Sequence, residues 1–281
     1  AVFAASKDYS ASIAAFRRAY DVAPSKVQPM VTLVRSYLLA GKAGEAMDFL
    51  GSVIQASPEN VTALLLLGEL QAANGDSAEA VQSFERVIDL QPQNTAGYTN
   101  LANLRMREGH TDAAEQVIGR GLLAVPGNFD LLMAQASIYE VSRRFEEAIA
   151  AYEALFKTYP GSDVVVNNLA SLLSEHRTDQ ASLLRAYEMT QRFSRSDAPY
   201  FKDTLGWANY RLGKFDEGLP LLESAVRQMP GQPIFRYHLG MSYAALNRKE
   251  LARQELEKAR ELSQGDNQQS TEQIRRALEG L

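Results

Sequence analysis

The residue types suited to acid–base or metal chemistry are scattered along this 281-residue chain. The three histidines, His110, His176 and His238, are widely separated in the sequence, so no pair has the i, i+4 spacing of a zinc-binding helix. There is no cysteine, which excludes thiolate metal sites and disulfides. The adjacent Glu146 and Glu147 fit a helix start, where negative charge is favourable, better than paired acid–base catalysis.

One stretch superficially resembles a phosphate-binding loop. Gly206 is followed by Gly213-Lys214, but six residues separate the glycines where the loop has four, and Phe215 replaces Ser or Thr. The loop also needs a strand before it, whereas this stretch has a helical pattern. We therefore predict a chain that is not an enzyme and that needs no cofactor and no metal.

Other residues have types suited to holding a peptide or a sugar. A side-chain amide can donate to a peptide C=O and accept from an N–H, and an aromatic ring can pack on an apolar surface. The candidate ligand-contacting residues are Asn100, Asn103, Arg107, Asn167, Asn168, Tyr200, Asp203, Trp207, Tyr237 and His238; their assignment to a ligand-contacting wall is what the family resemblance given below implies. For Trp207, the only tryptophan, packing between helices is favoured over a role as an open aromatic platform.

A repeat determines which elements position these candidates. Pro24, Pro58, Pro92, Pro126 and Pro160 are each 34 residues apart, and Pro230 follows two periods plus two residues later. With the proline at position 32, full units begin at Val27, Val61, Thr95, Phe129, Asp163, Pro199 and Pro233. Position 8 is small in six of the seven units, and position 20 is mostly alanine. Small residues there let two antiparallel amphipathic helices approach closely, with apolar residues filling the seam.

Each unit has its own stop signals. Gly41, Gly75, Gly109 and Gly213 occupy position 15, where we expect a left-handed residue to end the first helix. The proline ends the second helix. Because one hairpin cannot bury its own apolar face, successive hairpins must stack.

This pattern resembles the tetratricopeptide repeat (TPR) family over nearly the whole chain. The resemblance implies an all-α fold, a right-handed α-solenoid of helix-turn-helix repeats. We expect residues 1–26 to be a leading partial repeat, residues 27–264 seven units, and residues 265–281 a linker and a capping helix with Ile274, Ala277 and Leu278 on one face. The chain opens in mid-repeat, which suggests a fragment of a longer protein.

The fifth unit departs from the period. It spans 36 residues, from Asp163 to the residue before Pro199, and the stretch from Glu175 to Gln180 lacks the turn glycine. A lengthened surface turn is favoured over a functional loop. Ala186 is expected to serve as the second-helix alanine in a shifted register.

The resemblance also implies where a ligand binds, because in TPR proteins first-helix positions 2, 5, 6, 9, 12 and 13 line the concave wall. A chaperone-type carboxylate clamp is not supported, since its basic positions hold residues such as Gln28, Val31 and Thr62. Asn100 and Asn168 at position 6 resemble the asparagine ladders of peptide-binding TPRs, although other units interrupt the ladder.

Residues 163–260 are similar to a narrower group of bacterial TPR proteins. The strings from Asp203 to Trp207 and from Tyr210 to Lys214, together with Asn167–Ala170, Leu219–Glu223 and Tyr237–Gly240, resemble proteins found with exopolysaccharide export and PEP-CTERM-type sorting. This resemblance implies a bacterial periplasm or envelope, with cytoplasm as the alternative. An excess of arginine over lysine also favours a bacterial source.

These observations predict a scaffold that binds an extended peptide or partner helix in the concave groove. The alternative is a polysaccharide-binding or export-assembly module, and an enzyme would need a catalytic domain outside this sequence. A net charge of −5 without clustered basic residues argues against nucleic acid as a partner. Apolar runs such as Ala63–Leu67 are too short to span a bilayer.

Overall fold

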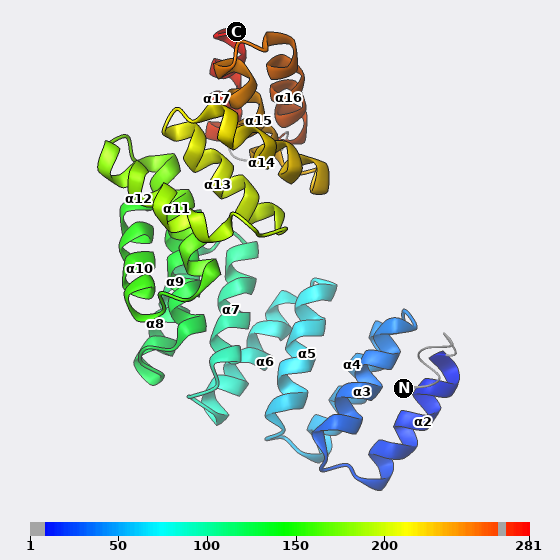
Figure 1. Ribbon diagram of the computed structural model, residues 1–281. Coiled ribbons are helices and arrows are strands. Elements are labelled where there is room, and N and C mark those ends of the chain that lie inside the picture. Colours follow the sequence, from blue (N-terminus) through cyan, green and yellow to red (C-terminus); the bar gives the residue numbers. More distant parts are fainter. Residues whose placement is uncertain (1–8, 264–267) are drawn as a thin grey trace. The chain divides into compact units, whose positions relative to one another are not determined.

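The computed structural model describes residues 9–263 and 268–281, and within these ranges every regular element is a helix (Figure 1). The chain divides into two compact units, residues 1–142 and residues 143–281. Unit 1 contains α2 (Tyr9–Val22), α3 (Val27–Leu39), α4 (Ala43–Ala56), α5 (Val61–Asn74), α6 (Ser77–Leu90), α7 (Thr95–Arg107), α8 (Thr111–Ala124) and α9 (Phe129–Val141). Unit 2 contains α10 (Phe145–Thr158), α11 (Asp163–His176), α12 (Gln180–Thr190), the 3-10 helix η1 (Gln191–Phe193), α13 (Pro199–Arg211), α14 (Phe215–Gln228), α15 (Pro233–Ala245), α16 (Lys249–Leu262) and α17 (Gln268–Glu279). The predicted all-α solenoid of helical hairpins is confirmed.

Side-chain caps and prolines fix the starts of many helices. Asn60, Asn94 and Asn128 accept a hydrogen bond from the backbone N–H three residues ahead, at the starts of α5, α7 and α9. Helices α13 and α15 begin instead with Pro199 and Pro233, whose fixed φ suits the first helical position. The first helix of each hairpin thus begins at the residue where the 34-residue period starts a unit.

Outside the irregular fifth unit, the turn inside each full hairpin uses a left-handed residue. Gly75 and Gly213 have φ values of 94° and 76°, and Gly41 and Gly109 also have positive φ, which confirms the predicted role of these glycines. Arg143 and Asn247 adopt φ values of 62° and 57° at the same position of two other units. A left-handed residue with a side chain costs about 1–2 kcal/mol, so the turn geometry is retained even where it is strained.

Close approach of the paired helices explains the small residues at position 8. A Cβ added to Gly206 would lie 2.8 Å from Leu222 on α14, and one added to Gly240 would lie 2.7 Å from Leu256 on α16. Gly68 is in the same relation to the Phe84 ring in unit 1. The large residue at position 24 therefore fills the space that the glycine leaves open.

The irregular unit distributes its two additional residues over two places. The interval from the start of α11 at Asp163 to the start of α12 at Gln180 is one residue longer than the same interval in every other full hairpin. The interval from the start of α12 to the start of α13 at Pro199 is also one residue longer than its counterparts. The predicted lengthened turn therefore accounts for one residue, and the second lies after α12, near η1. Ala186 is fully buried in α12, as predicted.

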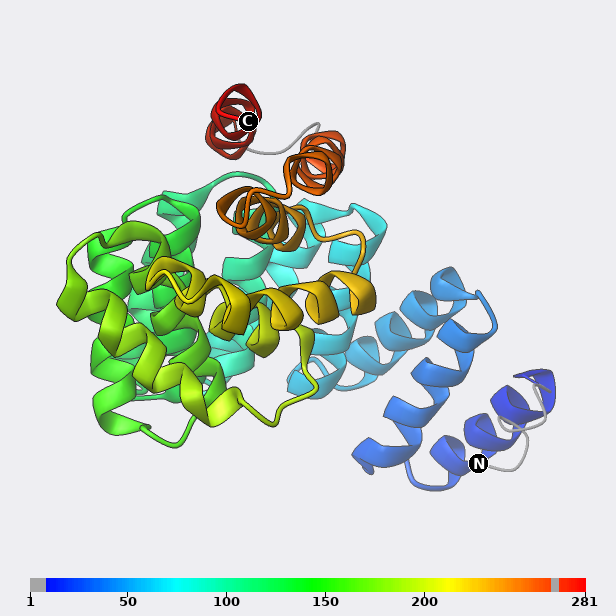
Figure 2. The ribbon, with the colours of Figure 1, turned by 45° about the horizontal axis from the view of Figure 1, so that its top comes forward.

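Helix α17 covers the end of unit 2. In Figure 2 it is the dark red helix next to the C-terminus. Ile274, Ala277 and Leu278 pack against Leu256 of α16 in a cluster that also includes Tyr237, which confirms the predicted apolar face. The helix begins at residue 268, and the predicted linker lies mostly outside the described residues. Over the described ranges, no helix combines the length and apolarity needed to cross a membrane.

Candidate functional site

A buried histidine connects three first helices of unit 2. Nδ1 of His238 on α15 lies 2.9 Å from an Asp203 oxygen on α13. Nε2 of the same ring lies 2.8 Å from an oxygen of Glu175, near the end of α11. His238 and Asp203 are buried, and 23% of the Glu175 side chain is exposed. The imidazole thus bridges carboxylates that come from two other first helices.

The two carboxylates favour a protonated ring. Burial opposes the imidazolium, but the nearby charges and hydrogen bonds of Asp203 and Glu175 outweigh burial and raise the pKa of His238 to about 9. Burial raises the pKa of the Asp203 carboxyl, and the adjacent His238 opposes that rise. At neutral pH both ring nitrogens therefore donate to carboxylate oxygens, which is the stronger, charge-assisted form of hydrogen bond.

Aromatic rings cover this ionic cluster. The Trp207 ring stacks on His238 with centroids 4.1 Å apart, and its centroid lies 4.4 Å from that of Tyr210, with nearly parallel planes. Tyr237 packs against both Trp207 and His238 at a tilt. A cation stacked on an indole is attracted by the ring quadrupole, so the stack stabilises the charged histidine. Trp207 is only 5% exposed, which confirms the packing interpretation.

Arg211 fixes α13 to the end of α11. Its guanidinium donates to the backbone carbonyl oxygen of Ser174 and, over 2.8 Å, to that of Arg177. Carbonyls in the last turn of a helix have no intrahelical partner, so a neighbouring arginine satisfies them. Together with the histidine cluster, this contact holds the first helices of unit 2 in a fixed register.

An exposed apolar row runs along the same helices. Position 2 of α11, α13 and α15 holds Val164, Tyr200 and Ile234, with exposures of 51%, 49% and 42%. Unit 1 has Gln28, Thr62, Ala96 and Asp130 at this position. Tyr200 also packs edge-on against Phe235 of the next first helix, with centroids 5.3 Å apart. We call Val164, Tyr200 and Ile234 the apolar row.

The sequence-predicted site residues of unit 1 lie on α7. Asn100 donates to a Glu69 oxygen over 3.0 Å, so it links two consecutive first helices at the surface. Asn103 and Arg107 are exposed. These three residues belong to one compact unit and the remaining seven to the other.

In unit 2, four of the predicted residues come together: Asp203, Trp207, Tyr237 and His238. Asn168 lies apart from them and donates to the Tyr152 hydroxyl of α10 over 3.0 Å. Asn167 makes a long contact of 3.4 Å to the Asn168 oxygen. Both amide side chains thus take part in contacts on α10 and α11. Tyr200 belongs to the apolar row.

Sequence reasoning missed two members of the site, Glu175 and Arg211, which both occupy position 13. This position belongs to the wall that the family resemblance assigns to ligand contact, so position alone was a usable signal. A charged residue near a helix end is ordinarily solvated, however, and the sequence does not show that Glu175 faces a histidine 63 residues away.

No group of three or more potential ligand side chains is arranged to hold a metal ion within the described ranges. The nearest approach to one is the histidine cluster, where both ring nitrogens already face carboxylates.

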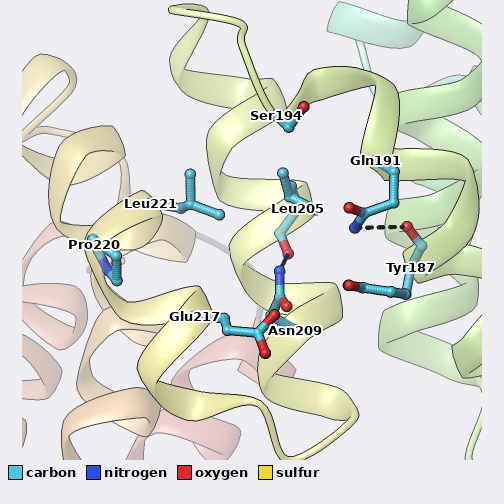
Figure 3. A pocket seen from close by; sticks show the side chains of 8 residues that line it. All are labelled: Tyr187, Gln191, Ser194, Leu205, Asn209, Glu217, Pro220 and Leu221. Atoms are coloured by element: carbon cyan, nitrogen blue, oxygen red, sulfur yellow. Dashed lines mark hydrogen bonds between the residues drawn. The ribbon is translucent and has the colours of Figure 1, made fainter.

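A separate pocket lies on another side of α13. Leu205 and Asn209 of α13 form its floor, between α12–η1 and α14 (Figure 3). The cavity measures about 250 Å³. Its lining residues are Tyr187, Gln191, Ser194, Leu205, Asn209, Glu217, Pro220 and Leu221.

Comparison with known families agrees with this architecture. Residues 50–166 match the family described as the cytochrome c-type biogenesis protein H TPR domain, and residues 204–267 match the family described as tetratricopeptide repeat. No curated protein matches the chain. The two matches and the fold support assignment of the chain to the tetratricopeptide repeat family.

Solved structures show the same fold. A tetratricopeptide repeat protein from Parabacteroides merdae superposes with a TM-score of 0.64 at 18% identity, over 90% of this chain and 97% of that one. The Cut9–Hcn1 structure, a hetero-tetramer of the APC/C, gives 0.65 at 13% identity, over 96% of this chain and 52% of that one. Yeast Tom70 gives 0.57 at 15% identity, over 98% and 58%.

Proposed function

We propose that this chain is a non-catalytic protein-interaction scaffold whose ligand is an extended peptide laid across the first helices α11, α13 and α15. The TPR fold itself suggests a protein-binding scaffold. The observation that carries the specific assignment is the apolar row: Val164, Tyr200 and Ile234 are large, apolar and about half exposed at one equivalent position of three consecutive first helices. Clustered exposed apolar side chains mark interaction surfaces in soluble proteins.

Helix spacing indicates the ligand's conformation. Packed helices lie about 8–10 Å apart, so equivalent side chains on consecutive first helices repeat at that interval. A peptide in the polyproline II conformation advances about 9.3 Å in three residues, and therefore presents every third side chain to the same face. The row thus fits a peptide with apolar side chains at every third position.

The polar contacts among the same three helices also support this proposal. The His238 cluster and the Arg211 contacts hold the three helices in register before any ligand binds. A preformed surface loses less conformational entropy on binding than a flexible one, so more of the contact energy appears as affinity.

The experiment selects peptides from a random library against the whole chain and measures their affinity by fluorescence anisotropy. The double variant Val164→Ser, Ile234→Ser should weaken binding by about tenfold or more, since loss of about 1.4 kcal/mol of apolar burial suffices for that change. Leu251→Ser is the matched control, because Leu251 is equally exposed at 42% but lies on the second helix α16. Equal affinity of the double variant and the control would refute the row as the binding surface.

The alternative is a polysaccharide-binding or export-assembly module. The resemblance of residues 163–260 to TPR proteins of exopolysaccharide systems supports it, as do the half-buried rings of Tyr210 and Tyr237. The deep burial of Trp207 leaves little of the largest ring for a sugar. Titration with polymeric sugars while following Trp207 fluorescence tests this alternative, and an unchanged spectrum would count against it.

We propose a bacterial envelope or periplasm as the setting, with partners in a secretion or export assembly. The support is the same resemblance of residues 163–260. Fractionation of the source cells with an antibody to this chain tests the setting, and recovery in the cytoplasmic fraction alone would contradict it.

A further inference from the structure

The pocket between α12–η1 and α14 has apolar walls and free acceptor groups. Leu205, Pro220 and Leu221 provide the apolar surface, and Glu217 is the only charged residue in the lining. The cavity of about 250 Å³ is smaller than the roughly 300–1,000 Å³ of small-molecule sites, so its size suits a single side chain.

Each amide group in the lining already uses one of its two N–H donors within the chain. Asn209 Nδ2 donates to the Leu205 carbonyl over 2.9 Å, and Gln191 Nε2 points to the Tyr187 carbonyl at 3.5 Å (Figure 3). The Asn209 side-chain oxygen is buried and has no hydrogen-bond partner in the described part of the chain. The lining therefore offers an occupant several acceptor oxygens: the two amide oxygens, the Glu217 carboxylate and the hydroxyls of Tyr187 and Ser194. An acceptor-lined site selects a ligand with several donors and a positive charge.

The rim of the pocket already holds a cation from the same chain. The Lys214 ammonium lies 4.0 Å from the centroid of the Tyr187 ring and 3.9 Å from a Glu217 oxygen. Both partners attract a positive charge, the first through its ring face and the second directly. Lys214 therefore shows how these groups attract a cation, and its ammonium would compete with a charged ligand for Tyr187 and Glu217.

From these observations we propose that this pocket binds the guanidinium of an arginine side chain from a partner protein. An arginine side chain ends in a planar guanidinium with five donors, which is more weakly hydrated than an ammonium and is carried on an aliphatic stem. Its donors match the acceptors of Gln191, Asn209 and Glu217, and its stem matches the apolar walls. The irregular fifth unit contributes directly, because Gln191 and Ser194 lie in and just after η1.

The experiment uses the whole chain with methyl-labelled leucine and titrates it with Nα-acetyl-arginine N-methylamide in NMR. The expected result is a saturable shift of the Leu205 and Leu221 methyl signals. The citrulline counterpart has nearly the same shape without the charge, and should bind at least about fivefold more weakly, since charge-assisted hydrogen bonds are roughly twice as strong as neutral ones. Equal binding of the two probes, or no shift at these methyl groups, overturns the proposal.

Three variants sharpen the test. Glu217→Gln should weaken the arginine probe about fivefold, and Lys214→Met should tighten it, because it removes the competing ammonium. Asp216→Asn is the matched control, as Asp216 is exposed on α14 but does not line the pocket, and it should leave binding unchanged. Wild-type affinity in Glu217→Gln, or weaker binding in Lys214→Met, overturns the assignment. If agmatine binds more tightly than the capped arginine, the natural ligand is a free small molecule. That result would overturn the assignment to an arginine side chain of a partner protein.

Discussion

Units 1 and 2 are built from the same hairpin but connect their first helices differently. In unit 1 the polar contact between consecutive first helices is the Asn100–Glu69 hydrogen bond, which is exposed. In unit 2 the corresponding contact is the His238–Asp203 pair, buried beneath aromatic rings. Between second helices, unit 1 has the bidentate Arg120–Glu85 pair at the surface.

This difference shows that the repeat pattern determines the backbone fold, whereas the side-chain contacts between first helices can differ from unit to unit. Solvent screens an exposed contact, so it contributes little and can change without loss of fold. A buried charge pair is costly to break, because removal of one partner leaves an uncompensated charge. Unit 2 should therefore respond strongly to changes on its first helices, and unit 1 only weakly.

The largest expected effect is that of Asp203→Ala. The substitution leaves the buried imidazole without its buried carboxylate partner and should lower the free energy of unfolding of unit 2 by about 3–5 kcal/mol. Trp207 is the only tryptophan, so urea unfolding followed by its fluorescence reports on unit 2 alone. Glu69→Ala, which breaks the exposed contact in unit 1, is the control and should change stability by less than about 0.5 kcal/mol by circular dichroism. Similar losses in both variants would remove the distinction between the units.

The next largest expected effect is a loss of stability of unit 2 at alkaline pH. The pKa of His238 is raised to about 9, above the unfolded value near 6.5. Its contribution is therefore fully present below about pH 6.5 and is lost as the pH rises through 9, amounting to at most about 3 kcal/mol. Burial raises the pKa of Tyr237 to about 12, so that group does not titrate in this window.

Urea midpoints of unit 2 measured between pH 6 and pH 10 test this dependence. The midpoint should fall with rising pH in the wild type and should be nearly flat in His238→Gln, which cannot carry the charge. A flat profile in the wild type would show that the ring is neutral in the folded chain.

The smallest effect is expected for Arg120→Ala in unit 1. Both members of its pair with Glu85 are more than one-third exposed, and hydrogen bonding to Arg120 lowers the pKa of the Glu85 carboxyl. Exposed pairs contribute about 0–1 kcal/mol, so the variant should lose no more than that, and less at high salt. A loss as large as that of Asp203→Ala would place a strong inter-repeat contact in unit 1 as well.

The helical framework was predictable because the same residue pattern recurs in successive units, so the helix boundaries are indicated several times in the sequence. Proline spacing located the hairpins, and the glycines at position 15 located left-handed turns that the structure contains. The packing of Trp207 also followed from the sequence, since aromatic residues are most often buried.

The partners of the buried charges were not predictable. Glu175 and His238 are 63 residues apart, and their contact depends on how three helices rotate against one another. The same limit applies to the pocket, where the Asn209 amide nitrogen bonds to Leu205 within the same helix and the amide oxygen has no hydrogen-bond partner among the described residues. Periodicity identifies which face of a helix is buried, but not which side chain of the next helix it meets.

The contact of His238 with Asp203 also bears on how this chain can evolve. Solenoids gain and lose whole hairpins, because each hairpin contacts only its neighbours. A hairpin inserted between α14 and α15 would separate the histidine from the aspartate and leave both charges buried and unpaired, and deletion of the α13–α14 hairpin would remove the aspartate. The three hairpins that supply Glu175, Asp203 and His238 must therefore be inherited as one block, while hairpins of unit 1 are free to duplicate or disappear.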